Sequence, residues 1–253
     1  MAFKSNMVLV LDTETCDLQG NVYDVGYTIA NKKGEIFAEY NSLVEEVFTD
    51  AKKMMGAFYA KKLFTHYAPM LDRNEISISP WANIVEQMQY DIAAYGVTTL
   101  AAYNLGFDRR VMRQTNNLLG NGKPICPKLQ QLDLWQFACE TKLSQKSYAK
   151  IARKLGWVSP AGNIKTGAEF AYRFCSGDFG FIEDHTALSD AIIETKIMAD
   201  CFSQKKRIPY GIINGAPWRI VNNNATGIDP DVHGSKTRGF LKLPSTITYA
   251  KGV

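Results

Sequence analysis

The segment that decides the fold of this chain is MVLVLDTET, residues 7–15. Its first five residues are all apolar, and the run stops at Asp12. A short, uninterrupted run rich in Val and Leu is typical of a strand buried on both faces. Side chains two residues apart in an extended segment point to the same side, so the carboxylates of Asp12 and Glu14 should face one point. We therefore expect a central strand that ends in two acids.

Two further strand-like stretches follow, over 22–30 and 35–44. The polar connection Asn31-Lys32-Lys33-Gly34 between them has the length of a hairpin turn. The pattern then becomes helical over 51–63 and again over 79–95, where Ser79 and Pro80 offer a cap and a first-turn proline.

Strand-like and helical segments also alternate in the second half of the main part of the chain. A short strand over 98–103 runs into a helix over 107–119, and further segments occupy 131–140 and 147–155. The longest helical pattern covers 184–204. Its apolar positions recur at three and four residues and predict one buried stripe: Ala187, Leu188, Ala191, Ile192, Thr195, Met198 and Ala199. Strands alternating with helices predict an α/β fold.

The chain changes character after residue 206. Residues 207–253 are rich in Gly and Pro, with strand-like pieces at 218–221, 240–243 and 246–249. They also hold the whole net charge of +4, since residues 1–206 carry 23 basic and 23 acidic side chains and the tail carries 6 and 2. We expect a main domain over 1–206 and a turn-rich, β-rich C-terminal extension over 207–253.

Composition excludes several classes of protein. Hydrophobic residues make up 46% of the 253 residues and charged residues 21%, which is ordinary for a globular chain and unlike a disordered or collagenous one. No apolar run approaches the roughly 18 residues of a membrane span. The first residues lack a secretory signal, and the five cysteines are odd in number and form no CxxC pair. We expect reduced thiols and a cytoplasmic protein that does not contact membranes.

Two more acidic positions resemble the first in their placement. Asp108 follows a strand and opens a helix, and Asp190 lies near the start of the longest helix, five residues after His185. Each has an ordinary explanation taken alone, because carboxylates favour turns and helix starts and a single histidine is usually structural. On a regular helix positions 185 and 190 do not share a face, so His185 should lie in the preceding loop or at the cap.

The three positions together resemble the DEDDh branch of the DEDD superfamily of 3'-to-5' exonucleases, which includes the proofreading subunit of bacterial DNA polymerase III and ribonuclease T. The first motif, Asp-x-Glu, resembles Asp12 to Glu14, and the second, Asn-x-x-Phe-Asp, resembles Asn104 to Asp108. The third, His-x-Ala-x-x-Asp, resembles His185 to Asp190. Thr186 stands where the sister branch has tyrosine, which favours the histidine branch.

This resemblance covers roughly residues 7–204 and implies a ribonuclease H-like fold, with a mixed central β-sheet flanked by α-helices. It also implies two Mg²⁺ ions, replaceable by Mn²⁺, held by Asp12, Glu14, Asp108 and Asp190, and a general base in His185. Oxygen ligands suit these ions, and two of them can stabilise the attacking and leaving oxygens of phosphodiester hydrolysis. Further, the resemblance implies substrate contacts by Thr13, Thr15, Asn104 and Phe107 at the 3' end of single-stranded DNA or RNA, with release of nucleoside 5'-monophosphates.

The sequence departs from the family at several places. Tyr103 replaces the histidine that often opens the second motif, and residues 54–79, 157–183 and the tail have no clear counterpart. The choice between DNA and RNA therefore stays open, as do a homodimer and a replication or repair partner. A ribonuclease H-like endonuclease and a non-catalytic nucleic-acid-binding scaffold are alternatives; the His-x-Ala-x-x-Asp motif argues against the first, and the complete set of acids against the second.

Other residue clusters favour structural interpretations. We expect solvent-exposed faces at Arg109, Arg110 and Arg113 and at Lys146, Lys150, Arg153 and Lys154. We expect core packing for residues 131–135, which resemble a sliding-clamp peptide, and for the aromatic residues Phe58, Tyr59, Phe64 and Tyr67. His66 and His233 have no partners at metal-ligand spacing.

Overall fold

The computed structural model describes residues 7–17, 20–57 and 60–226. A six-stranded mixed sheet forms its centre, in the order β4-β3-β2-β1-β5-β6. The strands are β1 (Met7–Asp17), β2 (Gly20–Ala30), β3 (Ile36–Val44), β4 (Ser77–Ser79), β5 (Val97–Ala102) and β6 (Gln130–Asp133). The pairs β1–β2 and β2–β3 are antiparallel, whereas β1–β5, β5–β6 and β3–β4 are parallel. This confirms the predicted mixed sheet and the hairpin at residues 31–34.

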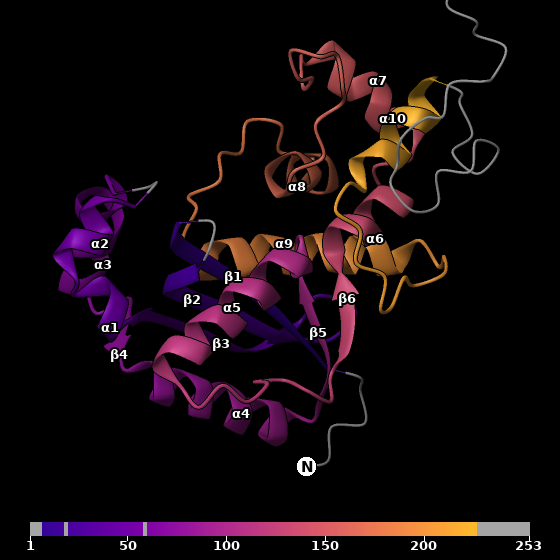
Figure 1. Ribbon diagram of the computed structural model, residues 1–253. Helices are drawn as coiled ribbons and strands as arrows, with labels where there is room; N and C mark the ends of the chain where they lie inside the picture. Colours follow the sequence, from indigo (N-terminus) through magenta and orange to yellow (C-terminus); the bar gives the residue numbers. More distant parts are fainter. Residues whose placement is uncertain (1–6, 18–19, 58–59, 227–253) are drawn as a thin grey trace, which may run out of the picture.

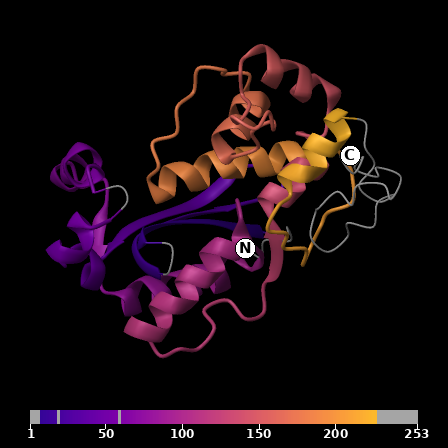
Figure 2. The same ribbon diagram turned by 45° about the horizontal axis from the view of Figure 1, so that its top comes forward.

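The continuous apolar run of β1 is explained by burial on both faces of the sheet (Figure 2). Met7, Leu9 and Leu11 belong to one hydrophobic core, and Val8 and Val10 belong to another. Successive side chains of a strand alternate between faces, so a strand between two helical layers must be apolar at every position.

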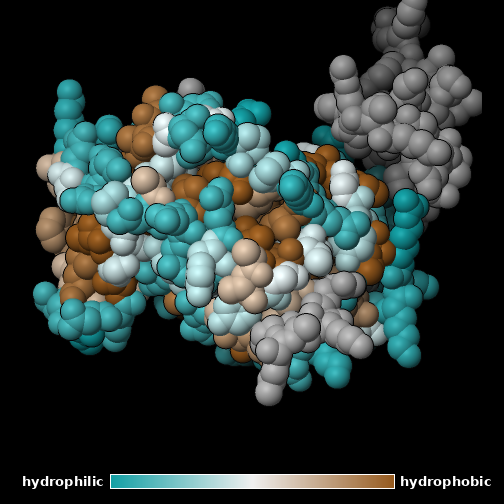
Figure 3. Space-filling view, turned by 90° about the horizontal axis from the view of Figure 1, so that it is seen from below, coloured by the Kyte–Doolittle hydropathy of each residue, from teal (hydrophilic) through white to brown (hydrophobic). Residues whose placement is uncertain are grey.

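The two helical layers are built from different parts of the chain. One face of the sheet is covered by α4 (Trp81–Tyr95) and α5 (Leu105–Leu119), through Trp81, Ile84 and Val111. The other is covered by α9 (Ala187–Ser203), with α6 (Leu134–Glu140), α7 (Lys146–Lys154), α8 (Ala168–Ser176) and α10 (Trp218–Thr226) packed around it (Figures 1 and 2). The space-filling view onto the α4 side shows apolar side chains in the middle of that face with hydrophilic ones around them (Figure 3).

A small helical lobe follows β3. It contains α1 (Glu45–Phe48), α2 (Ala51–Met55), the π-helix η1 (Leu63–Tyr67) and α3 (Ala68–Asp72), and it lies at one end of the sheet (Figure 1). Tyr67 is 1% exposed, and its ring contacts that of Phe48 within the lobe and that of Tyr23 on β2. The contact with Tyr23 attaches the lobe to the main core.

Three predictions about the elements were wrong, and one helix was missed. Residues 51–63 are not one helix, because α2 ends at Met55 and η1 begins at Leu63. Ser79 belongs to β4 and Pro80 is the N-cap of α4, not its first-turn residue. In α9 the buried stripe includes Ile193 and Ile197, while Ile192 is exposed. Residues 168–176, which had no predicted structure, form α8.

The predicted strand at 218–221 was also wrong, because this stretch begins the helix α10. Val221 is 1% exposed in the second core, where α10 contacts α6 and α7, and Asn222 bonds the backbone of Ile164. The first part of the extension therefore packs onto the body as a helix, while the strands expected at 240–243 and 246–249 lie outside the described residues.

Candidate active site

The first two acids lie where β1 has left its parallel neighbour. Pairing of β1 with β5 stops at Val10, but β1 continues along β2 to Asp17. Asp12 and Glu14 are therefore inside the strand, which corrects the prediction that it ends at Asp12; beyond Val10, β1 is paired with β2 alone. In this stretch Asp12 lies opposite Gly26 and Glu14 lies opposite Asp24.

Asp108 reaches the same region from the first turn of α5, directly after β5. It is 3% exposed, and the hydroxyl of Thr13 donates a hydrogen bond to its Oδ1 at 2.9 Å. The parallel pairing of β1 and β5 brings the two strand ends together, as expected for α/β sheets, in which ligand sites gather at the carboxyl ends of strands. Thr13, predicted to contact substrate, thus has a partner within the site.

The third group comes from the start of α9. Thr186 is the N-cap, and His185 lies in the loop before it with a φ of 55°, as the spacing predicted. The Nδ1 atom of His185 is 3.9 Å from Asp190 Oδ2 and 3.4 Å from Glu183 Oε2. Glu183 was not among the predicted residues; its only signal was its position two residues before His185.

Asp24 holds the start of α9 in place. Its Oδ2 accepts hydrogen bonds from the backbone N–H of Ala187 at 3.0 Å and from the hydroxyl of Tyr67 at 2.8 Å. A buried carboxylate at a helix N-terminus is favoured by the unpaired N–H groups and by the helix dipole. Asp24 was missed because an acid in a hairpin strand has no distinctive spacing.

These elements place Glu14, His185 and Asp190 in one group, with a possible ligand atom from each within 4.8 Å of the others. Asp190 is 5% exposed, and its Oδ1 is buried with no hydrogen-bond partner among the described residues. Buried carboxylate oxygens nearly always have a partner, so this oxygen is free to accept an ion or a water, as are Asp24 Oδ1 and Asp133 Oδ2. An oxygen-rich donor set with an unused buried oxygen fits a hard divalent cation such as Mg²⁺ or Mn²⁺.

Burial and mutual repulsion raise the pKa values of the carboxyl groups. Burial raises the pKa of Glu14 to about 7, that of Asp108 to about 7 and that of Asp190 to about 9. The pKa of Asp12 is raised by burial and then by the charges of Asp190, Asp108, Glu194 and Glu14, so these acids converge around Asp12. A cation bound among them would reverse this effect by stabilising the charged forms.

Two buried charged residues of the site were missed by the sequence interpretation. Glu194, one turn after Asp190, is 2% exposed and accepts a hydrogen bond from the backbone N–H of Tyr103 at 2.9 Å. Lys62 is 7% exposed, and its Nζ is 3.0 Å from Glu14 Oε1. The spacing of four between Asp190 and Glu194 could have indicated Glu194, whereas nothing near Lys62 in the sequence relates it to Glu14.

The remaining predicted substrate residues lie on β1 and at the start of α5. Thr15 donates to the backbone carbonyl of Asp17 at 2.7 Å, and Asn104 precedes α5 in a left-handed conformation with a φ of 74°. Phe107 is partly buried, with the guanidinium of Arg110 over its ring at 5.2 Å. Tyr103 points away into the second core, where its hydroxyl donates to Thr166 O at 2.6 Å.

The structural interpretations of the other residue clusters were confirmed for some residues and wrong for Phe64. Leu132 and Leu134 are fully buried, which confirms core packing at 131–135. Tyr67 is in the core, but Phe64 is 70% exposed, so core packing was wrong for that residue. Phe58, Tyr59 and His233 lie outside the described residues, and His66 bonds Thr65. The basic side chains on α5 and α7 are exposed, as predicted.

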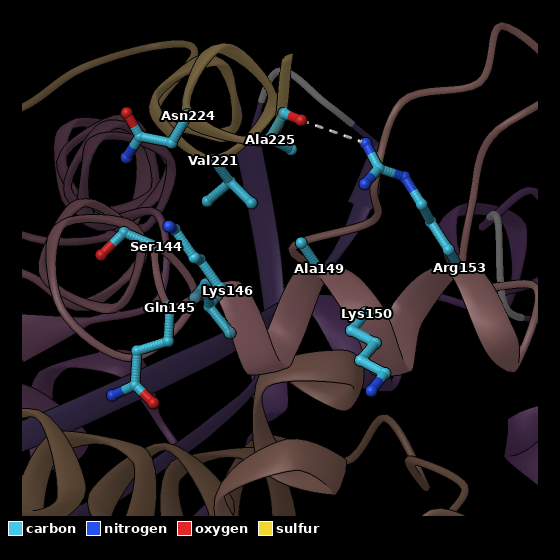
Figure 4. A pocket seen from close by; sticks show the side chains of 10 residues that line it. Ser144, Gln145, Lys146, Ala149, Lys150, Arg153, Val221, Asn224 and Ala225 are labelled. Atoms are coloured by element: carbon cyan, nitrogen blue, oxygen red, sulfur yellow. Dashed lines mark hydrogen bonds between the residues drawn. The ribbon is translucent and has the colours of Figure 1, made fainter. Parts of the chain in front are cut away.

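The basic residues of α7 line a pocket of about 410 Å³ against α10 (Figure 4). Lys146, Lys150 and Arg153 border it, and Arg153 bonds the backbone carbonyl of Ala225 at 3.5 Å. Arg109 on α5 instead donates to Gln131 Oε1 at 2.6 Å.

The helices of the described ranges are too short or too polar to cross a bilayer.

Comparison with known proteins identifies the fold. No protein-family model and no curated protein sequence matches the chain. Among solved structures, the chain is similar to the nuclease domain of 3'hExo, a DEDDh family member bound to rAMP, at 12% identity over 85% of this chain and 100% of that one, with a TM-score of 0.50. The sheet and its flanking helices thus form a ribonuclease H-like α/β fold.

Two further structures are similar at lower TM-scores. Exonuclease X in complex with 5' overhanging duplex DNA is 20% identical over 78% of this chain and 91% of that one, with a TM-score of 0.41. Exonuclease I of E. coli in complex with an oligonucleotide is 13% identical over 80% of this chain and 41% of that one, with a TM-score of 0.49.

Proposed function

We propose that this protein is a metal-dependent 3'-to-5' exonuclease of the DEDDh type. Its reaction would be hydrolysis of the terminal phosphodiester bond of single-stranded DNA or RNA. The observation that carries the proposal is the convergence of Asp12, Glu14, Asp108 and Asp190 with His185 at one end of the sheet. Three buried carboxylates beside the half-buried Asp12 are costly unless they bind a cation.

Asp12, Glu14 and Asp190 would hold the first of two divalent ions, and Asp108 and Asp12 would support the second. When bound, the ions would stabilise the negative charge that develops on the attacking and leaving oxygens. Asp24 contributes by fixing the N-terminus of α9, and therefore the direction of Asp190, through its bond to Ala187.

His185 would take a proton from the attacking water. Burial lowers the pKa of His185, which keeps the imidazole neutral and able to accept a proton near neutral pH. Glu183, at 3.4 Å from Nδ1, would orient the ring. The water oxygen forms a bond to phosphorus, the bond to the 3'-oxygen of the preceding nucleotide breaks, and that oxygen takes up a proton.

The backbone at residues 13–15 would meet the terminal 3'-hydroxyl and so restrict cleavage to strand ends. Asn104 and Phe107 would contact the last nucleotides. The expected products are nucleoside 5'-monophosphates and a strand shortened by one residue at a time.

The test compares a circular single strand with a linear one labelled at its 5' end, both with Mg²⁺ or Mn²⁺ and with matched DNA and RNA sequences. We expect stepwise shortening of the linear strand, an intact circle and no reaction in Asp190→Asn. Cleavage of the circle would instead indicate a ribonuclease H-like endonuclease, and binding without cleavage would indicate a scaffold.

A further inference from the structure

Lys62 places a buried cation at the edge of the acidic group. Its side chain comes from the lobe, immediately before η1, and only 7% of the residue is exposed. The ammonium is 3.0 Å from Glu14 Oε1 and also donates a hydrogen bond to the backbone carbonyl of His185. One side chain thus connects the lobe, β1 and the loop before α9.

Two of the residues that Lys62 contacts belong to the candidate metal group. Glu14 and His185 offer ligand atoms within 4.8 Å of each other and of Asp190. The Lys62 ammonium occupies one carboxylate oxygen of Glu14 by its hydrogen bond. It also adds a positive charge beside the position of a divalent ion. Two cations so close repel each other, particularly where burial reduces screening by water.

We propose that Lys62 is a built-in counter-ion, which pairs with Glu14 in the metal-free protein and is displaced when the first divalent ion binds. This inference rests on the proposed metal site. In the metal-free protein the ammonium compensates part of the charge of the buried acids. Because coupling between two sites is reciprocal, the metal weakens the Lys62 pair by as much as the pair weakens metal binding.

The lobe is built so that Lys62 can leave without unfolding the body. Lys61 and Phe64, on either side, are exposed, and the following residues form a π-helix, a rare structure that is frequent at functional sites. Tyr67 anchors the lobe independently by its bond to Asp24. Displacement of Lys62 therefore involves the segment 60–66, in which Leu63 packs against the main core, while the bond of Tyr67 to Asp24 can stay in place.

The first experiment measures Mn²⁺ affinity of the full-length protein by electron paramagnetic resonance, without substrate. We expect Lys62→Met to bind Mn²⁺ about tenfold or more tightly than the parent, because the competing charge is removed. Lys61→Met, which removes an exposed lysine at the adjacent position, should match the parent. Unchanged or weaker Mn²⁺ affinity in Lys62→Met would overturn the counter-ion inference and leave the proposed function standing. A parent protein that binds no Mn²⁺ would overturn both the inference and the proposed function.

The second experiment needs no variant and so does not depend on the folding of Lys62→Met. Hydrogen exchange of the unmodified protein is measured with and without Mn²⁺. Release of Lys62 should make the backbone amides of residues 60–67 exchange faster when Mn²⁺ binds, while those of α4 stay unchanged. Exchange at 60–67 that is unchanged or slower with Mn²⁺ would show that Lys62 stays in place and would overturn the inference.

Discussion

Gly26 of β2 lies directly beneath the first turn of α9, so closely that a Cβ atom on it would be 2.1 Å from the backbone nitrogen of Leu188. Gly26 is also the residue paired with Asp12 across the sheet. The absence of a side chain here lets the helix that carries Asp190 approach the strand that carries Asp12. The distance between these two acids therefore depends on a residue with no functional group.

Replacing Gly26 with Ala should displace α9 from the sheet, since backbone atoms cannot yield as a flexible side chain can. We expect a loss of about 1–3 kcal/mol in the free energy of unfolding and a marked loss of cleavage. Urea unfolding and an exonuclease assay measure the two effects. Gly215→Ala is the control, because a Cβ there would meet nothing within 4 Å. Equal stability and activity in both variants would contradict this account of α9.

Asp12→Asn removes the charge at the centre of the acidic group. Without metal the variant should be more stable than the parent, since the repulsion that raises the pKa of Asp12 is relieved. Each kcal/mol gained would raise Tm by about 2–4 °C in a protein of this size. Binding of Mn²⁺ and cleavage should both be lost. Asp72→Asn, at an exposed acid, is the control for stability, and retained cleavage in Asp12→Asn would end the two-metal assignment.

The metal-free protein should become more stable as pH falls. The pKa values of Glu14 and Asp108 are raised to about 7 and that of Asp190 to about 9, from ordinary values of 4.5, 3.8 and 3.8. The folded protein therefore binds more protons than the unfolded chain between about pH 4 and 9, and stability is lost as pH rises through the folded pKa values. Thermal unfolding between pH 5 and about 9 with a chelator would show this slope. Saturating Mn²⁺ should flatten it, and an equal slope with metal would contradict a site at these acids.

His185→Ala should lower turnover by about 10² to 10⁴, the usual contribution of a general base. Substrate affinity should change little, since the four carboxylates remain. In the parent, single-turnover rates at saturating Mg²⁺ should rise with pH below about 6.5, the reference histidine value, because the pKa of His185 is lowered. This rise should disappear in the variant. A variant with the parent's rate and pH profile would mean that His185 serves only as a loop residue before α9.

A chain ending at residue 226 tests the basic extension. Removal of all residues from 207 would strip α10 and expose the core around Val221, so the cut must follow the helix. Residues 227–253 carry four basic and two acidic side chains. We expect weaker, salt-dependent nucleic-acid binding and nearly unchanged turnover at saturating substrate. If the shortened protein binds nucleic acid as tightly as the parent at low salt, residues 227–253 serve the structure or a protein partner.

Part of the site could be predicted from local sequence alone. The apolar run before Asp12, the strand-to-helix change at Asn104 to Asp108 and the position of His185 ahead of a long helix are local features, and the structure has all three. The wrong predictions concern segments whose structure depends on packing. Residues 218–221 suit a strand by composition, but they form a helix where Val221 can be buried against α7 and α6.

The sequence by itself determined that Asp12 follows a buried apolar run and that Asp108 and Asp190 lie near the starts of helices, because strand burial and helix starts follow from short-range patterns of apolar and polar residues. Only the tertiary structure decided which other charges join them. Asp24, Lys62, Glu183 and Glu194 lie at unremarkable positions along the chain, and they meet the motifs because β1, β2, α9 and the lobe converge at one end of the sheet. Electrostatic interaction depends on distance in space and on burial, and neither can be read from separation along the sequence.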